Sequence, residues 1–188
     1  MEAIASSFLL VALSEMGDKT QLLAFALGSR YRRPWVVMGG ILAATLANHA
    51  LASSVGSWVA GVVPARALAA VLAITFIAFG LWTLKPDSLD EAERPGRFGP
   101  FLTTVVLFFL AEMGDKTQLA TVALAARFHS VVLVTTGTTL GMMLSDGIAV
   151  FAGGKLSGRP AMSWLRYLAA ALFIAFGVAS AWAAIRGK

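Results

Sequence analysis

The chain has 188 residues, of which 58% are apolar and 13% are charged, and its formal net charge is +5. Soluble domains carry about 25% charged residues, so this composition indicates an integral membrane protein that lies within a lipid bilayer. The basic residues flank apolar stretches and form no long polar face, which argues against nucleic acid as a partner. The chain has no cysteine, which excludes disulfides and thiolate metal sites.

The apolar stretches predict an all-α protein with six transmembrane helices, each of about 20 residues. The expected spans are residues 3–28, 35–58, 67–84, 99–126, 130–153 and 163–185. Residues 85–98 hold two prolines and seven charges, which is typical of a solvated linker. The expected organisation is therefore a three-helix unit at 1–84, a linker at 85–98 and a second three-helix unit at 99–188, together one transport domain. Met1-Glu2 lacks a basic n-region, so we expect no cleaved signal peptide.

The two halves of the chain are copies of each other. Eight residues, Glu15 to Leu22, recur without change as Glu112 to Leu119, 97 positions later. The same offset relates two turn regions. Gly56 and Gly61, near the end of the second predicted helix, match Gly153 and Gly158. The latter two lie in the turn after the fifth predicted helix, which contains Gly153-Gly154-Lys155 and Gly158-Arg159-Pro160. Because each unit has three spans, the second must enter the membrane from the opposite side. The sequence thus predicts inverted repeats related by a pseudo-two-fold axis in the membrane plane, as in secondary transporters.

Orientation follows from the basic residues of the connections, because cytoplasmic loops are enriched in Lys and Arg. The connections between helices 1–2, 3–4 and 5–6 carry nine: Arg30, Arg32, Arg33, Lys85, Arg94, Arg97, Lys155, Arg159 and Arg166. The opposite side carries four: Arg66, Arg127, Arg186 and Lys188. We therefore expect a cytoplasmic linker and both termini outside.

The repeated Glu-Met-Gly-Asp-Lys-Thr places ionisable groups at membrane depth, where they are costly and usually functional. On a continuous helix Glu15 and Asp18 would share a face, as would Glu112 and Asp115. The inverted symmetry would bring both faces into one cavity. Four carboxylates suit a hard divalent cation such as Ca²⁺, Mg²⁺ or Mn²⁺. Without the ion, like charges crowded at low dielectric would bind protons instead.

Several neighbouring polar residues are expected to support the acids. The predicted supporting set is Gln21, Gln118, Thr20, Thr117, Asn48, Asp146, Lys19 and Lys116. Asp146 is the remaining acid at membrane depth and a candidate proton carrier or ligand. His49 could supply a nitrogen that favours Mn²⁺, although a lone histidine in a membrane helix more often bonds to a neighbouring helix. Gly17 and Gly114 could let the helix unwind and free backbone carbonyls. The plain structural alternative is that each Glu pairs with the Lys four residues later.

This doubled Glu-x-Gly-Asp-Lys-Thr motif, in two three-helix halves joined by a charged linker, resembles the Golgi and bacterial manganese/calcium cation–proton exchangers. The resemblance covers essentially the whole chain. It implies exchange of Mn²⁺ or Ca²⁺ for protons, with the cation site at Glu15, Asp18, Glu112 and Asp115. Bacterial members resembling this chain are associated with manganese export, and the compact length favours a protein of the bacterial inner (plasma) membrane.

The predicted function is thus secondary transport, not enzymatic catalysis, with no cofactor beyond the transported cation. Three alternatives stay open. An intramembrane aspartyl protease could use Asp18 and Asp115 as a dyad, although both acids stand in the same context and no tyrosine precedes either. An exporter of a small amine or amino acid could use the carboxylates to bind an amine. A passive channel would conduct ions without coupling to protons.

Overall fold

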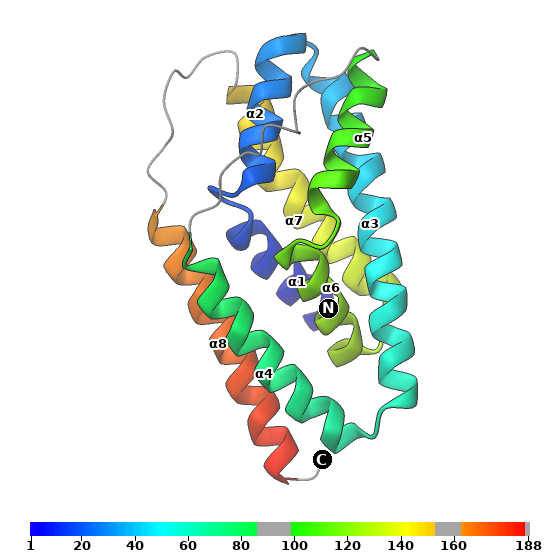
Figure 1. Ribbon diagram of the computed structural model, residues 1–188, viewed down its shortest axis with the longest axis vertical. Helices are drawn as coiled ribbons and strands as arrows, with labels where there is room; N and C mark the ends of the chain where they lie inside the picture. Colours follow the sequence, from blue (N-terminus) through cyan, green and yellow to red (C-terminus); the bar gives the residue numbers. More distant parts are fainter. Residues whose placement is uncertain (86–98, 153–162, 187–188) are drawn as a thin grey trace.

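The computed structural model describes residues 1–85, 99–152 and 163–186, and all regular structure there is α-helical (Figure 1). The helices of the first half are α1 (Glu2–Ser14), α2 (Lys19–Tyr31), α3 (Pro34–Val62) and α4 (Ala65–Thr83). Those of the second half are α5 (Pro100–Glu112), α6 (Lys116–Phe128), α7 (Val131–Ala152) and α8 (Ser163–Arg186). Residues 86–98 of the predicted linker at 85–98, and the whole predicted turn from Gly153 to Pro160, lie outside the described residues.

Four described helices are long and apolar enough to cross a membrane, namely α3, α4, α7 and the part of α8 from Tyr167. The shorter helices α1 and α5 are also apolar. Large apolar side chains such as Trp58, Ile74 and Trp182 are exposed on the outer surface. A soluble protein rarely exposes so many large apolar side chains, so these helices fit a lipid environment.

The first and fourth predicted helices are each divided in two at the repeated motif. Gly17 and Gly114 have φ angles of +86° and +77°, a region that glycine enters without steric cost. After each glycine an aspartate starts a new helix as its N-cap, accepting a hydrogen bond from the next backbone N–H. The prediction that Glu15 and Asp18 share a face of one continuous helix is therefore wrong. The local unwinding considered at both glycines is observed instead.

Matching glycines let helices of opposite halves approach closely. A Cβ on Gly40 of α3 would lie 2.7 Å from the Thr104 Cβ of α5. A Cβ on Gly137 of α7 would lie 2.9 Å from the Ser7 Cβ of α1. These contacts are related by the 97-residue offset, so each half packs a broken helix against an unbroken helix of the other half.

The helices α4 and α8 pair with each other along their lengths (Figure 1). A Cβ on Gly80 would lie 2.8 Å from Ile174 Cγ1, and a Cβ on Gly177 would lie 2.7 Å from Ile77 Cγ1. These contacts are again repeat-related. The pair stands beside a bundle formed by the other helices, and the motif lies inside that bundle.

Candidate functional site

The helix breaks place all four motif acids in the protein interior. Glu15 and Glu112 are fully buried, Asp18 is 2% exposed and Asp115 is 8% exposed. Each glutamate lies at the C-terminal end of a first half-helix, and each aspartate caps the second. Acids buried to this extent need cations, protons or hydrogen bonds to offset their desolvation. The partners of each acid therefore decide what the site can bind.

Glu15 is held by hydroxyl groups from both halves. Its Oε2 accepts a hydrogen bond from Thr20 Oγ1 at 2.5 Å, and its Oε1 accepts one from Thr117 Oγ1. The second bond crosses between the repeats, so α6 and the first break are tied together here. Both threonines thus act on the same glutamate.

Lys116 forms an ion pair across the repeats. Its Nζ lies 2.6 Å from Asp18 Oδ2, and both side chains are almost completely buried. Asp18 Oδ1 also accepts the Lys19 backbone N–H at 2.7 Å. The Lys19 side chain is half-buried and, in the part of the chain that the structure describes, it pairs with no carboxylate. The sequence alternative of a Glu15–Lys19 pair within one helix is therefore not observed.

A second group of acids has buried oxygens that lack such partners. Both carboxylate oxygens of Glu112 and both of Asp146, together with Asp115 Oδ2, accept no hydrogen bond from any described residue. Glu112 lies within electrostatic range of Glu15, Asp18, Asp115 and Asp146. We call Glu112, Asp115 and Asp146 the open acids. Within residues 1–85, 99–152 and 163–186, no three such groups stand close enough to hold a metal together.

The two motif glutamines brace the breaks. Gln21 Oε1 accepts the Gly17 N–H at 2.8 Å, and Gln118 Oε1 accepts the Gly114 N–H at the same distance. The Gln21 amide also donates to the Ser145 carbonyl and hydroxyl of α7, at 3.1 and 3.2 Å. In this conformation each glutamine side-chain oxygen accepts a hydrogen bond from a backbone N–H and does not act as an ion ligand.

Asn48 of α3 matches Ser145 in the repeat, and it likewise bonds to a motif glutamine. Gln118 Nε2 donates to Asn48 Oδ1 at 3.5 Å, and Asn48 Nδ2 donates to the Phe109 carbonyl at 3.1 Å. His49 is fully buried, and neither ring nitrogen has a hydrogen-bond partner among the described residues. The repeat matches His49 with Asp146, so one half carries a base where the other carries an acid.

Sequence reasoning missed the helix starts and the cross-repeat bonds of Glu15 and Asp18. The helix starts had a readable signal. Asp18 and Asp115 are each preceded by glycine and followed three residues later by glutamine, which is close to a capping box. The choice of partner for Thr117 and Lys116 depends on tertiary packing and carries no local signal.

Comparison with known proteins identifies the chain. The sequence model of the divalent cation/proton antiporter GDT1 family matches it twice, over residues 3–91 and 100–188. The chain therefore belongs to the GDT1 family, a family of transporters and not of enzymes. This confirms the resemblance inferred from the motif, and the two matches fit the predicted duplication.

Individual relatives cover nearly the whole chain. A Vibrio cholerae protein named "Putative manganese exporter" is 42% identical over 182 residues, covering 96% of this chain and 91% of the relative. A GDT1-like protein of Synechocystis is 31% identical over 209 residues, covering 98% and 99%. GDT1-like protein 3 of Oryza sativa is 26% identical over 206 residues, covering 95% and 73%. No solved structure matches the chain.

Proposed function

We propose that this antiporter exports Mn²⁺ from the cytoplasm in exchange for protons, with Ca²⁺ as the second candidate ion. The observation that carries the proposal is the set of open acids. Glu112 and Asp146 together bury four carboxylate oxygens with no hydrogen-bond donor among the described residues. Such groups need a cation or protons, and a site that alternates between the two is what an exchanger requires.

The proposed ligands are Glu15, Asp18, Glu112 and Asp115, with Asp146 as proton carrier or additional ligand. Carboxylate oxygens suit Mn²⁺ and Ca²⁺ alike. The name of the Vibrio relative supports manganese and export. Four carboxylates with Lys19 and Lys116 leave a charge of −2, which one divalent ion would balance.

In the proposed cycle the open acids hold either the metal or protons. A metal entering the site replaces the protons on the open acids and brings Glu15 and Asp18 into its coordination. The Thr20 and Thr117 hydroxyls and the Lys116 ammonium then hold these two acids when the metal has left. The backbone breaks at Gly17 and Gly114 would let both motifs adjust as the occupant changes.

We further propose six spans in two inverted repeats, in which α1 with α2 and α5 with α6 each form one broken span. Support comes from the repeat-related contacts of α3 with α5 and of α7 with α1. Broken helices with charged residues at the break are typical of transporters with inverted repeats. The proposed setting is the bacterial inner membrane, with residues 85–98 in the cytoplasm and both termini outside.

Purified protein in liposomes that enclose a pH-sensitive dye tests the proposal. Separate additions of Mn²⁺, Ca²⁺ and Mg²⁺ should move protons in the direction opposite to the metal, with the largest response to Mn²⁺. Glu112→Gln and Asp18→Asn should abolish the response. Metal flux without proton movement would indicate a channel, and no metal response would favour a solute exporter.

A further inference from the structure

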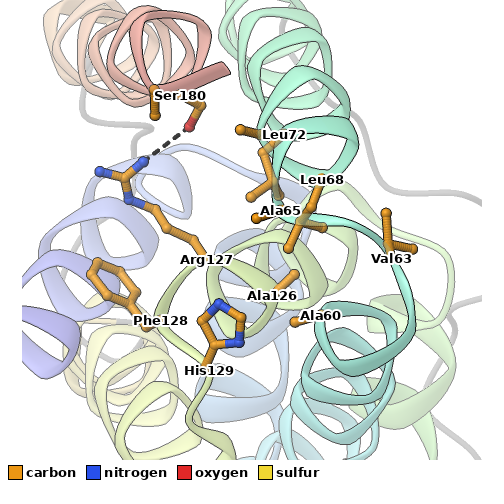
Figure 2. Close-up of a pocket in the computed structure, with 12 residues that line it drawn as sticks. Ala60, Val63, Ala65, Leu68, Leu72, Ala126, Arg127, Phe128, His129 and Ser180 are labelled. Carbon is orange, nitrogen blue, oxygen red and sulfur yellow. Dashed lines mark hydrogen bonds between the residues drawn. The ribbon is translucent and has the colours of Figure 1, made fainter. Parts of the chain in front are cut away.

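Arg127 ties α6 to α8 at one end of the bundle. It lies in the last turn of α6, and its Nη1 donates to Ser180 Oγ at 2.9 Å (Figure 2). The guanidinium carbon lies 5.0 Å from the ring centre of Phe176, and Ser180 Oγ donates onward to the Phe176 carbonyl. A basic residue in a last turn often serves only the helix dipole, but this one makes a specific tertiary contact.

The first half of the chain has an arginine, a hydroxyl residue and a phenylalanine at the corresponding positions, but its arginine does not bond to the hydroxyl. The 97-residue offset matches Arg127 with Arg30, Ser180 with Thr83, and Phe176 with Phe79. Arg30 is exposed and lies over the ring of its neighbour Tyr31 at 5.8 Å. Thr83 is 1% exposed, and its hydroxyl has no hydrogen-bond partner among the described residues. Buried hydroxyls are normally bonded, so this one is available for a partner.

Helix packing has the same asymmetry. At the Arg127 end, α4 contacts α6 and α8 contacts α1. The repeat-related pairs, α8 with α2 and α4 with α5, make no comparable contact in the residues that the structure describes. One apolar core contains α4 and α8 residues, including Leu72, Phe76 and Phe173. The described core at the Arg30 end is built from α2, α3, α5 and α7 alone.

We propose that Arg127–Ser180 and Arg30–Thr83 are alternative locks for the two conformations of the exchanger, an inference that rests on the proposed function. In the conformation described here the Arg127–Ser180 lock is closed and the α4–α8 pair packs against the Arg127 end. In the other conformation Arg30 donates to Thr83 and stacks on Phe79, and the α4–α8 pair packs against the Arg30 end.

A cavity lies beside the closed lock. Arg127 and Ser180 border a cavity of about 410 Å³ whose lining comes from the ends of α3, α6 and α8 and the start of α4 (Figure 2). The apolar wall includes Leu68 and Leu72 of α4. Leu68 and Leu72 also belong to the apolar core shared with α6, so a shift of the α4–α8 pair would widen this cavity by separating that core.

Single reporter cysteines test the locks, because the natural chain contains none. Ser29→Cys in α2 and Ala126→Cys in α6 are repeat-related positions near the two locks. Each is combined with Ser180→Ala or Thr83→Ala and labelled with maleimide in liposomes without metal. Ser180→Ala should raise labelling at Ala126→Cys about tenfold and lower it at Ser29→Cys, because it removes a hydrogen bond to a charged group.

Thr83→Ala should change labelling at both reporter cysteines in the opposite direction. It weakens only the conformation in which Arg30 donates to Thr83. Ser180→Thr and Thr83→Ser, which keep the hydroxyl, should label as the parent does. Ser54→Ala removes a hydroxyl that bonds within α3 and should change nothing. Shifts of equal sign in the two alanine variants, or no shift in either, would overturn the proposal. Since no metal is present, the result is independent of which ion is exchanged.

Discussion

Glu15 and Glu112 are equivalent residues of the repeat, yet their surroundings differ. Glu15 accepts hydrogen bonds from Thr20 and Thr117, whereas Glu112 accepts none from the described residues. A carboxylate with two donors is stabilised without an ion, and one with none is not. We therefore expect Glu15 to contribute to folding stability as well as to ion binding, and Glu112 to contribute chiefly to ion binding.

Replacing each glutamate by glutamine separates these contributions. Glu15→Gln should lower the free energy of unfolding by about 1.5–3 kcal/mol for each weakened bond to the charged group. Glu112→Gln should leave stability unchanged or raised, because it removes a buried carboxyl group that has no donors among the described residues. Both should abolish metal-dependent proton flux. Thermal unfolding in detergent and flux in liposomes measure the two effects. A Glu112→Gln protein less stable than Glu15→Gln would contradict this account.

The two lysines of the motif should also differ. Lys116→Met leaves the buried Asp18 carboxylate without its cation, and breaking a buried pair costs about 3–5 kcal/mol. Lys19→Met is the matched control, because Lys19 is half-buried and pairs with no carboxylate among the described residues. The melting temperature should therefore fall clearly in Lys116→Met and little in Lys19→Met. Equal losses in both would show that the ion pair contributes nothing specific.

At the scale of the helices, the positive φ angles of Gly17 and Gly114 hold the chain in the broken form. A Cβ at either residue would meet no atom within 4 Å, so backbone strain alone opposes substitution. Gly17→Ala and Gly114→Ala should each cost about 1–2 kcal/mol and slow transport by distorting the break.

Gly61→Ala is the control for these substitutions. A Cβ there also meets nothing within 4 Å, and Gly61 lies near the end of α3 with no positive φ. Its melting temperature and transport rate should equal or exceed those of the parent, since alanine favours the helix. A loss at Gly61 as large as at Gly17 would mean that the left-handed backbone is not the cause.

The sequence predicts the helical class because hydropathy and the exact repeat are local patterns. It also indicates buried acids, since Glu15 and Asp18 stand inside an apolar stretch. It does not predict that Lys116 pairs with Asp18 or that Thr117 bonds Glu15, because these partners are about 100 positions apart and meet only after packing. Two identical motifs also give no reason to expect unequal surroundings, which arise from how the helices pack around each.

At the scale of the whole molecule, the orientation is a prediction from the basic residues of the connections. Ser88→Cys in the linker should resist a membrane-impermeant maleimide in intact cells and react after the membrane is opened. A cysteine added after Lys188 should react in intact cells, because the C-terminus is expected outside. Labelling of Ser88→Cys in intact cells would reverse the proposed orientation.

The central claim is that one set of buried acids carries either a metal or protons. The most direct measurement is uptake of radioactive Mn²⁺ into liposomes whose interior is made acidic relative to the outside, with no other gradient. Outward proton movement should drive Mn²⁺ uptake above the equilibrium level, and reversal of the pH gradient should drive Mn²⁺ out. The Glu112→Gln protein should show neither movement. Uptake that reaches only equilibrium, whatever the pH gradient, would contradict the exchange mechanism.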